Sequence, residues 1–220
     1  MTAAKSIGPR LRQMREQTDM SLRAVARELG VSPAFLSQIE HGKSQPSVAT
    51  LYALARLFGA PLDAFFDAEE DAAPKLKISD APLSRNDFAS PMDIDWGDRD
   101  TQAKISFVRP DDRLAITMQE GVRWEKLAAT PDASVTFVEV IYEPGAMSAD
   151  RGVPLVHEGY EYAYALAGEL QITIGDVALT LRAGDTIGFN SSIPHFLRNT
   201  GTTDFRGVWF VHASRGLNGH

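Results

Sequence analysis

One short segment carries small and polar side chains along a single face of a predicted helix. Between Ser32 and Glu40, the apolar residues Phe35, Leu36 and Ile39 recur at helical spacing, so they should face a core. The side chains left on the outward face are Pro33, Ala34, Ser37 and Gln38. The helix therefore presents a compact surface that a partner can approach closely.

These outward residues suit the edges of DNA bases. The amide of Gln38 can form two hydrogen bonds with adenine, and the hydroxyl of Ser37 can donate or accept one. Ala34 can touch a thymine methyl group, whereas Pro33 offers only shape. Gln38 is thus the predicted main reader of sequence.

Residues near this helix are suited to phosphate contacts. Lys43 and Ser44 follow its end, and Arg10 and Arg23 lie near the starts of the two preceding helices. Side chains of these types hold a protein on the DNA backbone without reading sequence. We therefore expect these four residues to contact phosphates.

The surrounding sequence predicts the elements that must position the reading face. Ser21 and Ser32 are good helix N-caps, Pro33 suits a first helical position, and Gly30 suits a turn between two helices. A helix, a short glycine-containing turn and a second helix can place the second helix in the major groove. Further helix starts near Ile7, Pro46 and Pro61 predict a bundle of five helices over residues 1–66.

This part of the chain resembles the lambda-repressor-like helix-turn-helix domain of phage repressors and Xre-type regulators. The segments that carry the resemblance are Ile7-Gly-x-x-Leu-Arg12-x-x-Arg15, Ser21-Leu-x-x-Val-Ala26, Gly30-Val-Ser and Ile39-Glu40-x-Gly42-Lys43 with Pro46-Ser47. The resemblance implies that Arg15 pairs with Glu40 and so holds the reading helix in place. It also implies binding to double-stranded DNA.

Charge and composition are compatible with that expectation. The net charge is -7, but residues 1–66 carry eight Lys/Arg and five Asp/Glu, whereas residues 67–220 carry fourteen and twenty-four. A basic N-terminal part can approach phosphates while the acidic remainder is repelled. The chain has no cysteine, no apolar run long enough for a membrane span and no secretory signal pattern, so we expect a cytoplasmic protein that does not contact membranes.

The remainder divides into a connecting segment and a β-rich part. Residues 67–100 begin with an acidic Ala/Pro-rich linker and continue as an irregular segment. Residues 101–220 contain β-branched and aromatic runs, including 104–108, 114–118, 135–141, 169–174 and 208–211, separated by turn residues. Such a pattern predicts an all-β sandwich or barrel.

This β-rich part resembles the cupin superfamily, a jelly-roll barrel. The resemblance rests on Gly145-x11-His157-x3-Glu161-x6-Gly168 and on Gly184-x9-Pro194-His195-x3-Asn199. Metal-binding cupins carry a further histidine two residues before the first motif histidine, where this chain has Leu155. The resemblance implies that His157, Glu161 and His195 converge in the barrel, with the fourth ligand missing.

Three roles remain open for these three residues. They can hold Zn, Mn, Fe or Ni with open positions for water or a ligand, or they can contact an effector directly or form a structural network. Strand alternation from Glu161 directs Ala163 and Ala165 inward, and Leu170 and Ile172 should supply an apolar pocket wall.

The whole chain thus predicts an α+β protein with a helix-turn-helix domain at 1–66 and a cupin domain at 101–220 that senses a ligand and dimerises. It should act as a non-enzymatic transcriptional regulator, with repression as the expected output. Its affinity for a palindromic operator should depend on a small-molecule effector. One reading helix covers too few base pairs, so a homodimer is expected. The alternative is a metal-dependent cupin enzyme of the dioxygenase or isomerase type that carries a DNA-binding domain.

Overall fold

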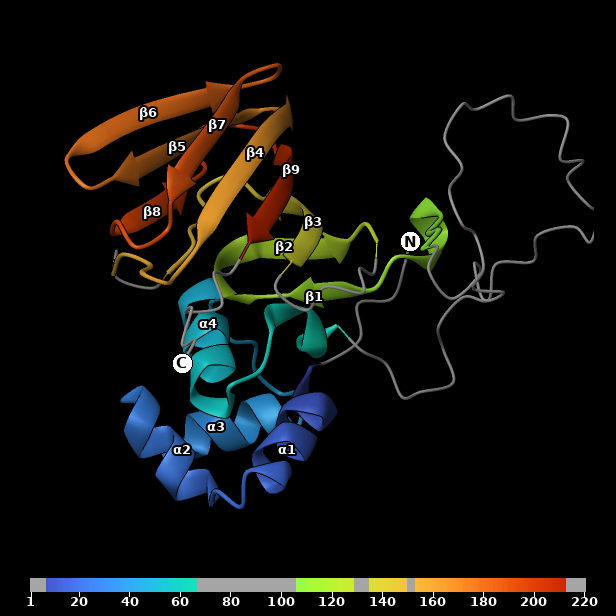
Figure 1. Cartoon of the computed structure of the whole chain (residues 1–220), viewed down its shortest axis with the longest axis vertical. Coiled ribbons are helices and arrows are strands. Elements are labelled where there is room, and N and C mark those ends of the chain that lie inside the picture. The colour runs from blue at the N-terminus through green and yellow to red at the C-terminus, as the bar shows by residue number, and fades with distance from the viewer. Residues whose placement is uncertain (1–6, 67–105, 129–134, 150–152, 213–220) are drawn as a thin grey trace, which may run out of the picture.

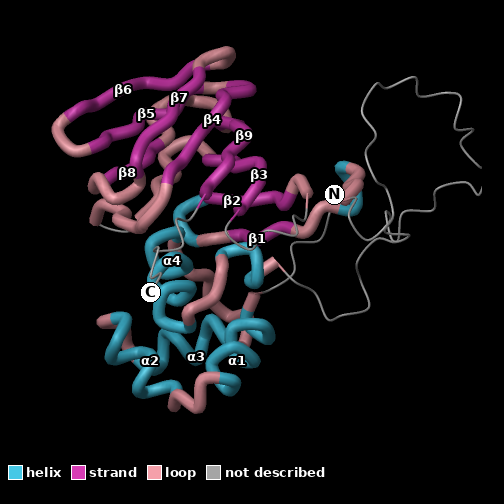
Figure 2. The backbone as a smooth tube through the Cα atoms, viewed as in Figure 1, coloured by secondary structure: helices cyan, strands magenta, loops and turns pink. Residues whose placement is uncertain are grey.

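The computed structural model describes residues 7–66, 106–128, 135–149 and 153–212. The predicted connecting segment, 67–100, lies outside these residues. The described chain forms a helical part and a β-rich part (Figures 1 and 2). Within the described residues, no helix is long and apolar enough to cross a membrane.

Four α-helices form the N-terminal part: α1 (Gly8–Gln17), α2 (Leu22–Leu29), α3 (Pro33–Glu40) and α4 (Val48–Phe58). The hydroxyls of Ser21, Ser32 and Ser47 cap the last three by accepting from a backbone N–H three residues ahead. Gly30 ends α2 with a φ of 68°, a conformation in which glycine has no steric cost. The helix starts and the α2–α3 turn therefore follow from local sequence signals.

The predicted fifth α-helix is wrong. Residues Leu62–Phe65 form a single 3-10 turn after Pro61, with the Ala64 N–H donating to the Pro61 carbonyl at 3.1 Å. A segment of four residues is too short to continue with the hydrogen bonds between residues four apart that define an α-helix. The turn instead brings Phe65 and Phe66 into the helical core, where both are buried.

The β-rich part contains two sheets. The larger has the strand order β1 (Ala115–Thr117), β2 (Val122–Lys126), β3 (Val135–Tyr142), β9 (Phe205–His212), β4 (Tyr160–Ala167) and β7 (Thr186–Asn190). The smaller has the order β6 (Val177–Arg182), β5 (Glu169–Ile174) and β8 (His195–Arg198). All the described pairings are antiparallel, and the core lies between the sheets.

One predicted strand does not form over its described residues. Residues 106–108 are not in a strand, and Phe107 is exposed with the Arg109 guanidinium over its ring. Residues 104 and 105 lie outside the described residues. Pro110 begins a 3-10 turn directly afterwards, and none of the described strands pairs with this segment. A β-branched run without a pairing partner has no ladder to stabilise it.

The two parts are packed against each other through α4 and the segment before it. The Ala49 N–H donates to the Ser148 carbonyl at 3.2 Å, and the Gln119 N–H donates to the Pro46 carbonyl at 2.9 Å. Lys126 pairs with Asp63 at 2.7 Å. In Figure 1, α4 lies between the β strands and the remaining helices, so it connects α3, the helix predicted to read DNA, to the barrel.

Candidate functional site

The outward face of α3 is accessible on the described part of the chain. Pro33, Ala34 and Gln38 are exposed, and Ser37 is partly buried. Leu36 and Ile39 are buried in the helical core. The four predicted reading residues therefore lie on one short helix, α3, which is on the far side of α4 from the β strands (Figure 1).

Sequence reasoning missed His41, which lies at the end of this face. Its side chain is exposed, and its Nδ1 lies 2.7 Å from the Ser37 carbonyl oxygen. A hydrogen bond there would hold the imidazole against the last turn of α3. The residue follows the predicted helix directly, and its position at the helix C-terminus is the available signal.

The predicted phosphate-contacting residues occupy different environments. Arg23 and Lys43 are exposed. Ser44 is partly buried, with its hydroxyl 3.4 Å from the side-chain nitrogen of Gln119 in the β-rich part. Arg10 donates from Nε to the Ala64 carbonyl at 2.9 Å and from Nη1 to Gln13 at 2.8 Å. The Arg10 guanidinium thus ties α1 to the 3-10 turn, and this geometry does not favour a phosphate contact.

Arg15 and Glu40 form a two-point ion pair. Arg15 donates from Nε and Nη2 to the two carboxylate oxygens at 2.6 and 3.1 Å, and from Nη1 to the Met20 carbonyl at 3.2 Å. The carboxylate raises the pKa of Arg15 through its hydrogen bond, against the lowering effect of burial. The pair joins α1 to the last residue of α3 and therefore fixes the angle of the reading helix.

A second candidate site lies inside the barrel, where His157, Glu161 and His195 converge. Glu161 Oε1 lies 2.7 Å from His157 Nε2 and 3.2 Å from His195 Nε2. Glu161 comes from β4 and His195 from β8, so the two sheets contribute one residue each, while His157 precedes β4. Each of the three offers a ligand atom, and these atoms lie within 4.8 Å of one another.

Outer hydrogen bonds orient the carboxylate and one imidazole. The indole N–H of Trp209 donates to Glu161 Oε2 at 2.7 Å. His195 Nδ1 lies 2.9 Å from the Ile193 carbonyl oxygen, which can only accept, so Nδ1 donates there and, in the neutral ring, Nε2 keeps its lone pair. Hydrogen bonds of this kind to the far ring nitrogen orient metal-binding imidazoles in other proteins.

Electrostatics keep the carboxylate ionised. Burial alone would raise the pKa of Glu161, but the hydrogen bond with His157 and the adjacent His195 imidazole lower it to about 2. Burial would lower the pKa of His195, but the adjacent Glu161 carboxylate raises it. The Glu161 carboxylate is therefore a negative charge held between the imidazole nitrogens of His157 and His195. A metal cation can take the place of the protons on these nitrogens.

The donor set fits a divalent metal ion. His195 Nε2 is buried and has no aligned hydrogen-bond partner among the described residues, despite lying 3.2 Å from Glu161. An unpaired buried nitrogen is costly unless something binds it. Two imidazoles and a carboxylate are ligands that zinc, manganese, iron and nickel all accept.

The lining of the pocket differs from the expected one. Ala163, Ala165, Leu170 and Ile172 are buried, but none of them lines this pocket. Its lining residues are Val48, Tyr52, Trp124, Val140, Tyr142, Leu155, Glu161, Leu197 and Trp209. Large aromatic side chains thus fill space beside the carboxylate, where strand alternation predicts room next to small alanines.

Two lining residues come from the helical part, which sequence reasoning did not anticipate. Val48 and Tyr52 lie one turn apart on α4. The Tyr52 ring stacks on the His157 ring with a centroid distance of 4.1 Å and an interplanar angle of 14°. It also meets Trp124 edge-on at 6.1 Å. The helical part of the chain therefore contributes to the wall of the barrel pocket.

Comparison with known proteins places both parts in described families. Residues 11–65 match the helix-turn-helix family, and residues 138–211 match the cupin domain family. The HTH-type transcriptional regulator PuuR of Escherichia coli is 26% identical over 194 residues, which cover 88% of this chain and 87% of PuuR. The regulator SutR of the same organism is 25% identical over 96% of this chain and 97% of its own length.

A solved structure shows the same fold. The HTH_3 family transcriptional regulator from Vibrio cholerae is 24% identical, covers 96% of both chains and has a TM-score of 0.58. Its resemblance extends over the helical and the β-rich parts together. The chain thus carries a helix-turn-helix domain followed by a cupin domain, and it is similar over most of its length to HTH-type transcriptional regulators.

Proposed function

We propose that the chain is a sequence-specific transcriptional regulator, a repressor, whose operator affinity depends on a small molecule bound in the cupin pocket. The proposal assigns DNA binding to residues 1–66, a connecting role to 67–100, and ligand sensing with dimerisation to 101–220. The observation that carries it is the exposed face of α3, with Gln38 presented outward and the helix fixed by Arg15 and Glu40. A protein of this kind works where the DNA is, in the cytoplasm.

Substitution of Gln38 tests the reading face. Gln38→Ala should abolish discrimination between an operator and its variants, because the bidentate amide contact contributes about 1–3 kcal/mol of base selectivity. The operator is first selected from random duplexes with the wild-type chain, and affinities are then measured by fluorescence anisotropy at fixed salt. Gln171→Ala, at an exposed glutamine of β5, is the matched control. Unchanged discrimination in Gln38→Ala would remove Gln38 as the reader.

The pocket supports ligand binding through its unpaired polar atoms. Trp124 is buried and lines the pocket, and its indole N–H has no hydrogen-bond partner among the described residues. Together with the aromatic walls and the Glu161 carboxylate, it suits a small molecule that carries a hydrogen-bond acceptor. A divalent metal held by His157, Glu161 and His195 would supply a Lewis-acidic point for such a ligand.

The enzyme alternative makes a different demand on the same pocket. The space available to the centre of a water molecule is about 10 Å³, which is room for roughly one water. With Tyr52 in place, neither a substrate nor an effector has room beside Glu161, so the volume alone does not separate the two functions. The relatives that match over most of the chain are named transcriptional regulators, which favours a sensing role. We propose binding without turnover, and oxygen-consumption assays on the metal-loaded chain with candidate ligands would contradict it if they showed turnover.

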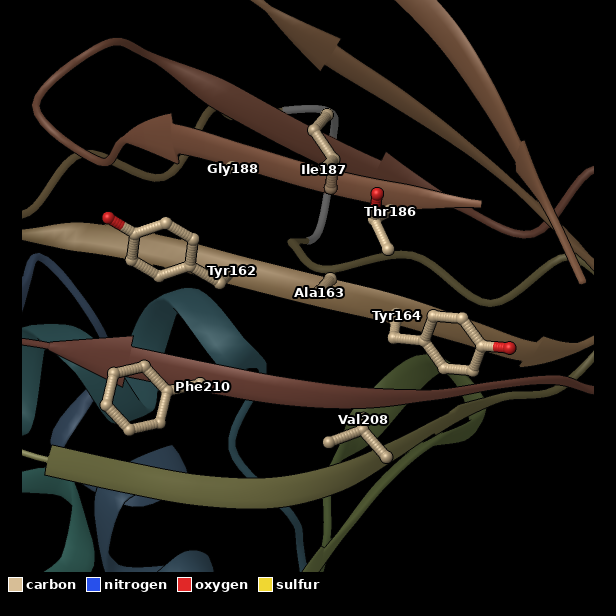
Figure 3. A pocket seen from close by; sticks show the side chains of 8 residues that line it. All are labelled: Tyr162, Ala163, Tyr164, Thr186, Ile187, Gly188, Val208 and Phe210. Atoms are coloured by element: carbon tan, nitrogen blue, oxygen red, sulfur yellow. The ribbon is translucent and has the colours of Figure 1, made fainter. Parts of the chain in front are cut away.

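The proposed dimer uses the outer face of the larger sheet. Tyr162 and Tyr164 from β4 and Phe210 from β9 are exposed on this face, beside Thr186 and Gly188 of β7 (Figure 3). An exposed apolar face of this kind marks an interaction site in a soluble protein. A second copy of the chain is the proposed occupant, because two reading helices about 34 Å apart are needed for a palindromic operator.

A further inference from the structure

The stacked pair of Tyr52 and His157 joins the two functional sites of the molecule. Val48 and Tyr52 face the pocket from α4, whereas Leu51, Leu54 and Ala55 of the same helix are buried in the helical core. Residues four apart lie on one helix face, so α4 presents one side to the pocket and another to the bundle. The helix cannot move at the pocket without moving within the DNA-binding part.

The pocket has no room for a ligand while α4 stays docked. Its free space holds roughly one water, and the Tyr52 ring covers one face of His157. A molecule that contacts both Trp124 and the Glu161 carboxylate must therefore take the place of the Tyr52 ring. Barrel residues such as Val140 and Leu197 are held in strands on the other sides, so the helix side is the one that can yield.

The contacts that keep α4 docked are of a kind that a ligand can displace. The Ala49 N–H of α4 donates to the Ser148 carbonyl. Just before α4 the Pro46 carbonyl accepts from Gln119, and just after it Asp63 pairs with Lys126. Contacts between domains of one chain commonly resemble transient interfaces. A ligand that binds only the undocked arrangement shifts the equilibrium toward it by its differential affinity.

We infer that α4 is the lid of the cupin pocket and that Tyr52 makes pocket occupancy and docking of the DNA-binding part mutually exclusive. The inference rests on the proposed regulator, because it names the contact through which an effector changes the position of α3. An occupied pocket releases the helical part from the barrel and so alters the spacing of two reading helices in a dimer.

A side chain that fills the pocket can stand in for the ligand. Val140→Phe adds a ring on β3 where about one water fits. The chain has no cysteine, so spin labels can be placed at Arg27→Cys on α2 and Asp176→Cys in the β5–β6 turn, both exposed. The distance between the labels, measured by double electron–electron resonance, should shift or broaden in Val140→Phe. Adding Tyr52→Ala should restore the wild-type distance, because the ring then occupies the vacated space.

Ile172→Phe is the matched control, since Ile172 is buried in β5 but does not line this pocket. It should leave the label distance unchanged. An unchanged distance in folded Val140→Phe would overturn the inference, as would an equal change in Ile172→Phe. These readouts need no DNA, so failure of the lid is distinguishable from failure of the regulator, which the Gln38 experiment reports.

A second measurement keeps the inference testable if Val140→Phe does not fold. Carbethoxylation by diethyl pyrocarbonate, followed by peptide mass spectrometry, reports the accessibility of each histidine. In Tyr52→Ala, His157 should react several-fold faster than in the wild type, while the exposed His41 reacts at the same rate. If His157 reacts at the same rate in folded Tyr52→Ala as in the wild type, the Tyr52 ring does not limit access to His157. That result would overturn the inference.

Discussion

At the residue scale, the stability of the DNA-reading part depends on one partly buried ion pair. Removing the guanidinium in Arg15→Ala leaves Glu40, whose side chain is 3% exposed, without its partner. Breaking such a pair costs about 3 kcal/mol when the remaining charge is buried. Thermal or urea unfolding should therefore show a clear loss of stability in the helical part.

Arg12→Ala provides the control for this prediction. Arg12 pairs with Glu16 at 2.8 Å, but both side chains are more than half exposed. Solvent screens such a pair, so its loss should be barely measurable. Equal effects of the two substitutions would show that the Arg15–Glu40 contact is no more than a surface pair.

The His157, Glu161 and His195 group makes a residue-scale prediction about metal. His195→Ala should lower the affinity for Zn²⁺ or Co²⁺ at least about 100-fold, because it removes a ligand whose tautomer is already fixed by the Ile193 carbonyl. Equilibrium dialysis with metal analysis measures it. His212→Ala, at an exposed position at the end of β9, should bind metal as the wild type does. Wild-type levels of bound metal in His195→Ala would assign the three residues to a structural network.

Residue patterns predicted the ligand group but not its surroundings. The two cupin motifs place His157, Glu161 and His195 at fixed distances from turns, so their convergence follows from the resemblance. The partner of Glu161, Trp209, comes from β9, and the partner of His157, Tyr52, lies more than 100 residues earlier in the chain. Such contacts depend on how the elements pack, which local spacing does not encode.

At the element scale, α1 and α3 approach closely at Gly8. A Cβ atom there would lie 2.4 Å from the Ile39 carbonyl oxygen and 2.5 Å from that of Glu40. Gly8→Ala must therefore push α1 away from the end of the reading helix, at a cost of roughly 3 kcal/mol for overpacking. It should also weaken operator binding, because Arg15 on α1 then no longer meets Glu40 in the same geometry.

Gly30→Ala separates this effect from a loss of backbone freedom. Gly30 has a φ of 68°, and a Cβ atom added to it would meet nothing within 4 Å among the described residues. The cost is therefore about 1 kcal/mol of conformational strain. Unfolding curves should rank Gly8→Ala as the more destabilising substitution. The opposite ranking would mean that the two helices can separate without cost.

The element boundaries that sequence predicts best are those with side-chain caps. Ser21, Ser32 and Ser47 each close a helix N-terminus, and these signals act within three residues. The segment after Pro61 has the signals of a helix start but forms only one 3-10 turn, because Phe65 and Phe66 are drawn into the core. A short segment next to a core follows the packing of its aromatic side chains rather than its local start signal.

At the scale of the whole molecule, the proposed mechanism requires two reading helices on one assembly. The outer sheet face offers apolar area for this purpose, and Tyr162 lies on it with its ring against Gly188 and 6.3 Å from that of Phe210 (Figure 3). A charge at this position would be buried without a partner in a symmetric interface, where two copies of it would meet. Tyr162→Glu should therefore halve the mass measured by light scattering or sedimentation.

The same substitution should weaken operator binding by more than about tenfold while leaving the fold intact, because each helical part then binds its half-site alone. Val177→Glu is the control: Val177 is equally exposed, at 56% against 52% for Tyr162, but it lies on the smaller sheet. It should remain dimeric and bind the operator normally. A dimer that survives Tyr162→Glu would move the interface elsewhere, and a wild-type chain that sediments as a monomer would require DNA itself to bring the two helical parts together.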